Sequence, residues 1–261
     1  MPDTELEREN RLLERRLRRL ESNVRSLEEL QDSNSRLLST VMGELEAERA
    51  RSRQLLLNVL PERIVARLEH GERPIADRHD EVAVLFSDFT GFTDIAARLE
   101  PIVLIAELDD LFAGFDRICA EHSVEPIKTI GDAYLGIGGL AGGGDPAVSV
   151  AQAALEMAAF VSGRPDQAAD WRIRIGIHIG PIVAGVVGAS RFAYDVWGDT
   201  VNVANRLEST SEPGRIHLSP EVAERLRGPF DLEARGPVEL KGKGAVETYY
   251  LLGRRDGERS S

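Results

Sequence analysis

The stretch Val82-Ala83-Val84-Leu85-Phe86-Ser87-Asp88-Phe89-Thr90-Gly91 is a short apolar strand that ends in a carboxylate and a glycine-containing turn. In Ile127-Lys128-Thr129-Ile130-Gly131-Asp132-Ala133-Tyr134, a second strand meets a glycine turn at an aspartate. Mg²⁺ prefers oxygen ligands, and enzymes that transfer phosphoryl groups often hold two such ions about 4 Å apart on a few carboxylates. The two stretches therefore favour Asp88 and Asp132 as a metal-binding pair. The alternative is that each aspartate only caps a helix or fixes a turn, positions at which aspartate is common.

The composition predicts one globular domain with an extension. With 261 residues, of which 42% are hydrophobic and 29% charged, the chain can bury a core of about 150 to 200 residues. The formal net charge of -12 gives no basic surface for nucleic acid or an anionic membrane. An anionic small substrate would therefore have to be met by local cations and bound metal.

The single cysteine and the lack of long apolar runs predict a cytoplasmic protein without a membrane span. Cys119 has no partner for an internal disulfide, which fits a reducing compartment, and its apolar helical surroundings indicate a core residue. No apolar run approaches about 18 residues, and the N-terminus is charged rather than signal-like. A zinc site is not expected, because ligand spacing is lacking among the histidines, which are His70, His79, His122, His178 and His217.

The N-terminal region predicts a long helix that pairs with a second copy. Residues 4 to about 60 are rich in Leu, Glu and Arg, and they contain no proline and no glycine except Gly43. A heptad frame gives the seam of a parallel coiled coil, with Leu6, Leu13, Leu20, Leu27, Asn34, Val41 and Leu55 at one position and Leu17, Val24, Leu38 and Leu45 at the other. Polar residues at seam positions, including Glu48 and Ser52, predict that the coiled coil is locally less stable there. The alternative is a single long helix packed on its own domain.

From Val82 onward, strand-like runs alternate with helical ones, which predicts an α/β sandwich in which helices cover a sheet. Strands are expected at about 82–88, 125–130, 133–138, 172–179, 182–187, 215–218, 230–234 and 246–252. Helices are expected at about 92–99, 101–122, 146–162, 199–210 and 219–226. Between the two parts of the chain, Pro61 should kink or restart the helix, and Gly71 and Pro74 should stop it.

Three motifs together resemble those of the class III nucleotidyl cyclases. They are Phe86-Ser87-Asp88-Phe89-Thr90-Gly91-Phe92-Thr93, Lys128-Thr129-Ile130-Gly131-Asp132-Ala133-Tyr134 and Tyr194-Asp195-Val196-Trp197-Gly198-Asp199-Thr200-Val201-Asn202-Val203-Ala204-Asn205-Arg206. The resemblance covers residues 82 to 252 and implies the ferredoxin-like α+β sandwich of that family. The expected organisation is a coiled-coil helix at 1–54, a transducer element at 55–80, a cyclase catalytic domain at 81–253 and a polar tail at 254–261.

The resemblance also implies a two-metal site. Asp88, Asp132 and the backbone carbonyl of Phe89 would hold two Mg²⁺ or Mn²⁺ ions. These ions would bind a triphosphate, lower the pKa of the ribose 3′-hydroxyl and stabilise charge on the α-phosphate as pyrophosphate leaves.

Lys128 and Asp195 resemble the pair that reads the base. An ammonium can donate to adenine N1 and a carboxylate can accept from the 6-amino group, whereas guanine presents the opposite pattern at both places. Guanylyl members of the family typically carry Glu and Cys there, so the resemblance implies ATP. Without it, Lys128 would be interpreted as a strand-end lysine that reaches to water, and Asp195 as a turn residue.

Asn202 and Arg206 lie four residues apart and would share a face of a helix. By resemblance, Asn202 orients the ribose and Arg206 stabilises the transition state, although Arg206 alone could be an exposed arginine on an amphipathic helix. Lys241 resembles a triphosphate-binding lysine, and Lys243 is the less favoured candidate for binding the triphosphate. One departure is Pro181 after Gly180, where some cyclase domains place an arginine on the terminal phosphates; how the β- and γ-phosphates are held is therefore open.

The leading interpretation is a homodimeric adenylyl cyclase that converts ATP to 3′,5′-cyclic AMP and pyrophosphate. The resemblance implies that the metal aspartates of one subunit face the base readers, Asn202, Arg206 and Lys241 of the other. The coiled coil would keep the two copies together and could receive a signal from an upstream sensor. The alternatives are a guanylyl cyclase and a non-catalytic dimeric module that binds nucleotide or relays helix motion.

Overall fold

The computed structural model describes residues 5–164, 168–188 and 192–255 and divides the chain into two compact units, Met1–Glu72 and Arg73–Ser261. The predicted tail at 254–261 lies outside the described residues beyond residue 255. Within the described ranges, no helix has the length and apolarity that a membrane span requires.

The described residues of the first unit form two helices. α1 (Glu5–Leu57) is 53 residues long, and α2 (Glu62–Glu69) follows it. Pro61 immediately precedes α2, where its missing N–H is not needed by the helix, so the predicted restart at Pro61 is confirmed. Arg53 Nη1 lies 2.5 Å from a carboxylate oxygen of Glu69. This contact is solvent-exposed and contributes little stability.

The apolar side chains of α1 are exposed in the single chain. Leu20 and Leu27 at one predicted seam position are 63% and 65% exposed, and Leu38 at the other is 63% exposed. Leu30 and Leu37, which lie next to seam positions, are also exposed, so the apolar stripe is wider than the predicted seam. The side chain of the seam residue Leu6 lies outside the described residues. An uncovered stripe of this kind is typical of a helix that packs against a partner.

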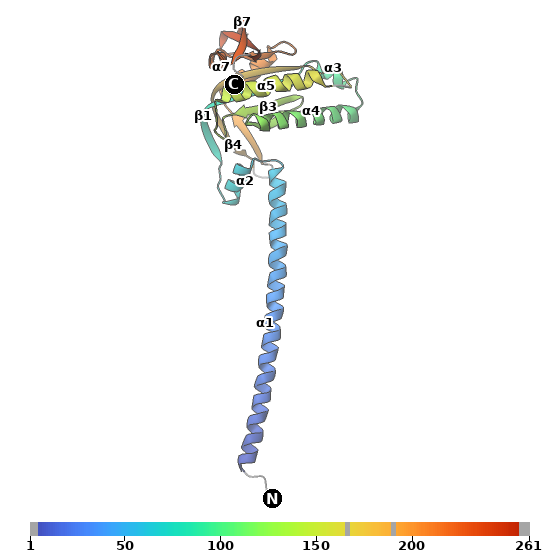
Figure 1. The fold of residues 1–261 in the computed structure, drawn as a ribbon, viewed down its shortest axis with the longest axis vertical. Coiled ribbons are helices and arrows are strands. Elements are labelled where there is room, and N and C mark those ends of the chain that lie inside the picture. The colour runs from blue at the N-terminus through green and yellow to red at the C-terminus, as the bar shows by residue number, and fades with distance from the viewer. Residues whose placement is uncertain (1–4, 165–167, 189–191, 256–261) are drawn as a thin grey trace, which may run out of the picture. The chain divides into compact units, whose positions relative to one another are not determined.

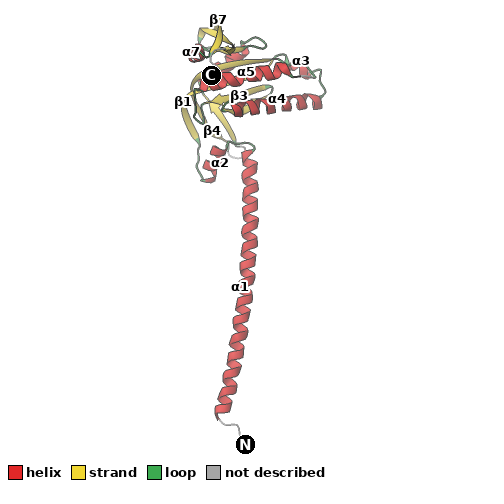
Figure 2. Ribbon diagram, in the orientation of Figure 1, coloured by secondary structure: helices red, strands yellow, loops and turns green. Residues whose placement is uncertain are grey.

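The second unit is a sheet covered by helices (Figures 1 and 2). Its strands are β1 (Ala76–Phe89), β2 (Val124–Ile130), β3 (Ala133–Gly138), β4 (Ile173–Val187), β5 (Ala193–Trp197), β6 (Ile216–Leu218), β7 (Phe230–Leu240) and β8 (Gly244–Arg254). In the described part of the chain these eight strands form one sheet in the order β2-β3-β1-β4-β6-β8-β7, and β5 pairs with β4. The helices are α3 (Phe92–Ala96), α4 (Pro101–Glu121), α5 (Pro146–Gly163), α6 (Asp199–Ser209) and α7 (Pro220–Leu226).

The main core lies between the sheet and the pair α4 and α5, which lie side by side in Figure 1. It includes Leu85 of β1, Phe115 of α4 and Met157 of α5, all of them buried. The sequence starts α5 in the expected way, because the Asp145 side chain accepts the Ala147 N–H at 2.9 Å and Pro146 occupies the first turn. The predicted sandwich, in which helices cover a sheet, is confirmed.

Cys119 is confirmed as a core residue. Its side chain is fully buried, and burial raises the pKa of the thiol to about 11. The Tyr134 hydroxyl lies 3.4 Å from the sulfur and donates to Asp116 at 2.7 Å. A protonated thiol in this position contributes packing rather than reactivity.

β4 is a single strand where two strands, at 172–179 and 182–187, were predicted. Proline cannot donate to a ladder and is therefore rare inside a strand. The neighbouring strand β1 accommodates it, because its register with β4 shifts between His79 and Val82, which pair with Ile182 and Gly180. Pro181 thus lies opposite a bulge, which is one of the few places where a sheet accepts proline.

Helix α6 lies unusually close to β4. A Cβ atom on Gly176 would lie 2.2 Å from the Glu208 backbone nitrogen and 2.3 Å from the Ala204 carbonyl oxygen. The neighbouring residues Ile175 and Ile177 point into the main core, so Gly176 faces the opposite side of the sheet. Only glycine permits this approach of the helix to the strand.

We expect Gly176→Ala to lower the free energy of unfolding by about 2 kcal/mol or more, because the added methyl group must displace backbone atoms of α6. Urea denaturation would measure the change. Gly253→Ala in β8 is the matched control, since a Cβ there has no atom within 4 Å, and it should change stability by less than about 0.5 kcal/mol. Equal midpoints for the two variants would contradict the close approach.

Candidate active site

The two predicted metal aspartates come together where β1 ends beside the turn between β2 and β3. Asp88 lies near the end of β1, and Asp132 lies in the turn between β2 and β3. Since Ser87 pairs with Tyr134 in an antiparallel ladder, the same register continued by one step places Asp88 opposite Ala133, the residue next to Asp132. Burial raises the pKa of Asp132, and the negative charge of Asp88 raises it further. The two carboxylates are therefore close enough to repel each other.

These residues fit a divalent cation. The carboxylates are partly buried and like-charged, so a cation between them would relieve a repulsion that the raised pKa of Asp132 records. The Phe89 backbone meets Asp132 through its N–H, while its carbonyl as a metal ligand stays a prediction. The described residues contain no cluster of three or more His, Cys, Asp or Glu side chains suited to a metal. A cation at Asp88 and Asp132 would thus take further ligands from the backbone, water or a bound phosphate.

Lys128 and Asp195 form an ion pair although they are 67 positions apart in the sequence. Lys128 Nζ on β2 lies 2.5 Å from Asp195 Oδ2 on β5. The other carboxylate oxygen of Asp195 accepts the Val196 N–H at 2.8 Å. Because β5 is held in register on β4, the acid is fixed on a rigid element. Strand β5 was not among the predicted strands, although the alternating burial of Tyr194 and Val196 follows the pattern that marks one.

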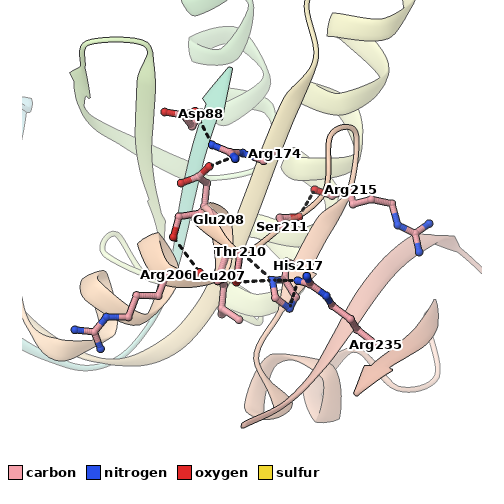
Figure 3. A network of polar contacts seen from close by, with 11 residues as sticks. Asp88, Arg174, Arg206, Leu207, Glu208, Thr210, Ser211, Arg215, His217 and Arg235 are labelled. Atoms are coloured by element: carbon pink, nitrogen blue, oxygen red, sulfur yellow. Dashed lines mark hydrogen bonds and ion pairs between the residues drawn. The ribbon is translucent and has the colours of Figure 1, made fainter. Parts of the chain in front are cut away.

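Asn202 and Arg206 lie on α6, as predicted. Asn202 is exposed and Arg206 is half-buried. In Figure 3 the Arg206 side chain extends away from Asp88 and from the polar network behind the helix. The side chains of both residues can therefore contact a bound molecule.

The two candidate lysines of the turn between β7 and β8 differ in their contacts. Lys243 Nζ lies 2.5 Å from Asp199 Oδ2 at the start of α6, and this hydrogen bond lowers the pKa of Asp199. Lys241 is exposed and makes no ion pair within the described ranges. Of the two, Lys241 is the one with its ammonium free for a phosphate. Sequence reasoning missed Asp199 as the partner of Lys243.

A second missed feature is a bridge behind the aspartates. Arg174 Nη2 donates to Asp88 Oδ1 at 3.0 Å, and Arg174 Nε lies 3.0 Å from Glu208 Oε1 on α6 (Figure 3). Glu208 is only 3% exposed. Burial raises the pKa of Glu208 to about 7, with repulsion from Asp88 as the next cause. The sequence signal that could have revealed this bridge is Glu208 itself, an acidic residue on the inward face of an amphipathic helix.

The histidines do not form a metal site among the described residues. His217 is completely buried and lies 2.8 Å through Nδ1 from the Leu207 carbonyl oxygen. Burial lowers the pKa of His217 to about 4. His178 Nδ1 lies 2.8 Å from Ser219 Oγ, and burial lowers its pKa as well. Both rings are packing elements that stay neutral at pH 7.

A family model described as the adenylate and guanylate cyclase catalytic domain matches residues 75–253. The chain belongs to this family. Divalent cations are generally used by class III cyclases, which agrees with the carboxylate pair. The predicted resemblance to the class III nucleotidyl cyclases is thereby confirmed.

The relatives include cyclases of both kinds. An adenylate cyclase of Mycobacterium tuberculosis is 44% identical over 217 residues, which cover 81% of this chain and 48% of that protein. Guanylate cyclase 2D of Rattus norvegicus is 40% identical over 242 residues, which cover 90% of this chain and 22% of that protein. This chain thus spans about half the length, or less, of these relatives. The catalytic core of a rhodopsin-guanylyl cyclase with converted specificity, in complex with ATPαS, is 37% identical with a TM-score of 0.66, and the match covers 69% of this chain and 98% of that one.

We expect Asp132→Asn to stabilise the metal-free protein at pH 7. A raised carboxyl pKa means that the native state binds a proton more tightly than the unfolded state, so stability falls as pH rises through that window. The asparagine variant lacks this loss, and its advantage over the wild type should shrink as the pH approaches 4. Urea midpoints with EDTA at several pH values would measure it.

The control for that measurement is Asp109→Asn on the exposed surface of α4. This substitution should leave the pH dependence of the midpoint unchanged. A pH profile of Asp132→Asn that runs parallel to the wild-type profile would show that Asp88 and Asp132 do not repel each other.

Proposed function

We propose that this chain is an adenylyl cyclase that converts ATP to 3′,5′-cyclic AMP and pyrophosphate at a site shared by two copies. The observation that carries the proposal is the contact between Lys128 and Asp195. After pairing, an ammonium keeps further N–H donors and a carboxylate keeps further lone pairs. The two residues thus offer a donor beside an acceptor, which matches adenine N1 and its 6-amino group and mismatches guanine at both positions.

The remaining residues have complementary roles in the proposal. Asp88 and Asp132 hold the metal ions, with the Phe89 carbonyl as a further ligand. When bound, two Mg²⁺ or Mn²⁺ ions supply Lewis-acid stabilisation of the triphosphate and acidify the ribose 3′-hydroxyl. Asn202 orients the ribose for attack of the 3′-oxygen on the α-phosphorus. Arg206 stabilises the transition state, and Lys241 binds the triphosphate.

Attack within one nucleotide forms the bond from the 3′-oxygen to the α-phosphorus and breaks the bond from that phosphorus to pyrophosphate. Correct positioning of the ribose therefore supplies a large part of the rate. Arg206 would neutralise charge that develops on the α-phosphate, as positioned guanidinium groups do in other phosphoryl transfers.

A shared site is supported by the direction of Arg206. In Figure 3 the Arg206 side chain extends away from Asp88 of the same chain, which favours a site to which a second copy supplies the arginine. A head-to-tail pair of identical chains would place both at each of two equivalent sites. The exposed apolar stripe of α1 supports a permanent pair through a parallel coiled coil at 1–54.

The proposed organisation gives the segment at 55–80 the role of a transducer between the coiled coil and the catalytic domain at 81–253. An upstream sensor or regulator would act through the helix pair and alter closure of the site. The buried thiol of Cys119 fits a protein of the reducing cytoplasm.

A guanylyl cyclase is the second candidate, because guanylate cyclase relatives match at 40% identity. We expect purified wild type with Mn²⁺ to turn over ATP at least about 10²-fold faster than GTP. Lys128→Glu with Asp195→Cys should lose most ATP turnover and shift the ratio toward GTP. Products would be identified by mass. Preference of the wild type for GTP, or turnover of neither nucleotide, would reject the adenylyl assignment.

The matched control for this specificity test is Lys243→Glu with Asp199→Cys. That pair has the same residue types and the same 2.5 Å separation, but it lies outside the proposed base pocket. Its total turnover can change, since it borders α6 and Lys241, whereas the ratio of ATP to GTP turnover should stay at the wild-type value.

We expect a mixture of Asp88→Ala and Arg206→Ala chains to regain activity that neither has alone. With random pairing, half of the dimers are mixed and each has one intact site, so about a quarter of wild-type activity should return. A mixture of Asp88→Ala with Asp132→Ala is the control and should stay inactive, because both changes affect the same half of the site. No recovery in heterodimers confirmed by differential tags would disprove the shared site.

A further inference from the structure

The turn between β7 and β8 carries two of the three lysines of the chain. Lysine occurs only as Lys128, Lys241 and Lys243 among 32 lysines and arginines. Lys128 and Lys241 are candidate site residues, and Lys243 follows Lys241 by two positions. Lysine carries a compact charge on a flexible stem, whereas arginine presents a rigid planar fork. A lysine at position 243 is thus an exception to the general use of arginine in this chain.

One leg of this turn is fixed to α6 by apolar packing. Leu240, the last residue of β7, is 2% exposed and lies in one apolar cluster with Leu207 of α6. The Lys243 N–H donates to the Leu240 carbonyl at 2.8 Å and closes the turn. Gly242 has a φ of 79°, the sign that the third position of a type II turn requires. Lys241 thus occupies the second position of a tight turn, directly after a buried anchor.

The other leg of the turn is fixed to α6 by charge. Lys243 Nζ lies 2.5 Å from Oδ2 of Asp199, the first residue of α6. This end of α6 is itself attached to β4, because the Thr200 hydroxyl, on a residue only 3% exposed, donates to the Pro181 carbonyl at 2.6 Å. Lys241 therefore lies between two legs that are both attached to the same helix.

Stability does not account for the pair of Asp199 and Lys243. Their side chains are 60% and 44% exposed, and ion pairs of this exposure contribute little to folding. An acid in the first turn of a helix is favoured by the helix dipole whether or not a lysine meets it. What the pair adds is a fixed position for the second leg of the turn.

We propose that Asp199 and Lys243 are positioning residues that hold the turn so that the Lys241 ammonium meets the triphosphate. Lys241 is exposed, so its long side chain loses conformational freedom when a phosphate binds. A turn that is already held limits this loss to the side chain itself. The inference rests on the proposed function, because it takes Lys241 as the residue that binds the triphosphate.

The test measures the affinity of the full chain for pyrophosphate in the presence of Mn²⁺ by calorimetry. Pyrophosphate lacks a base, so the choice between ATP and GTP does not enter. Asp199→Asn and Lys243→Met should each lower this affinity about 3-fold to 10-fold, because the turn must then be ordered on binding. The double variant should be no weaker than either single variant, since all three lose the same pair. Lys243→Arg should recover part of the affinity, because it keeps the charge but not the stem.

A role of Lys243 as a direct phosphate ligand predicts effects of opposite sign. Asp199→Asn would then free Lys243 and tighten pyrophosphate binding, whereas Lys243→Met would weaken it, and this pattern overturns the proposal. Wild-type affinity in both single variants overturns it too. In a Lys241→Met background, Asp199→Asn should have no further effect, which a purely structural role of the pair does not predict. An added loss in that background would show that the pair acts through another residue.

Asp231→Asn is the matched control. Asp231 meets Arg255 at 2.9 Å at the opposite end of the same hairpin, and their side chains are 51% and 57% exposed. The substitution thus removes the same charge from a similar pair and should leave pyrophosphate affinity at the wild-type value. If Asp199→Asn does not fold, Lys243→Met alone and combined with Lys241→Met carries the test, and losses that add would overturn the proposal.

Turnover separates this inference from the proposed function. For the nucleotide that is cyclised, Asp199→Asn should raise KM by the factor by which it lowers pyrophosphate affinity, with kcat changed less than about 2-fold. If the wild type binds pyrophosphate but cyclises neither nucleotide, the proposed function fails, while the affinities still decide the role of the pair. A wild type that binds no pyrophosphate overturns the inference, because Lys241 then has no anion to meet.

Discussion

The backbone contact between α6 and β4 at Gly176 is the constraint on which the rest of the site depends. A Cβ there would lie 2.2 Å from the Glu208 nitrogen, so only hydrogen fits between strand and helix. This approach brings the buried Glu208 carboxylate within 3.0 Å of Arg174. It also fixes the outer face of the helix, which carries Asn202 and Arg206. A side chain on Gly176 would push α6 away from β4. Glu208, Asn202 and Arg206 would then move together relative to Arg174, because all three lie on α6.

The region around the two aspartates holds more negative than positive charge. Three carboxyl groups, Asp88, Asp132 and Glu208, influence one another and share the guanidinium of Arg174. Burial and mutual repulsion raise the pKa values of Asp132 and Glu208, so the fold tolerates an electrostatic cost here. Perturbed carboxyl groups of this kind cluster at functional sites. A divalent cation would compensate the excess charge that remains beside Arg174.

Local patterns were sufficient to predict much of this structure from the sequence. The apolar run ending at Asp88 is a strand, and the helix predicted at about 146–162 is α5, because strand and helix patterns depend on neighbouring residues. Two features needed information from distant residues. The continuity of β4 through Pro181 depends on a bulge in β1. The bridge through Arg174 depends on an acid from α6, and no spacing in the sequence indicates which charges will meet.

The same network bears on how two sites in one dimer would influence each other. In the proposed head-to-tail pair, each chain gives Asp88 to one nucleotide and Arg206 to the other. Glu208 lies two residues after Arg206 on α6 and meets Asp88 through Arg174. A movement of Asp88 on metal binding would therefore act on the helix that serves the second nucleotide, and by linkage the second site would act equally on the first. Site closure in such a pair is a property of the dimer, so a change in the coiled coil would affect both sites together.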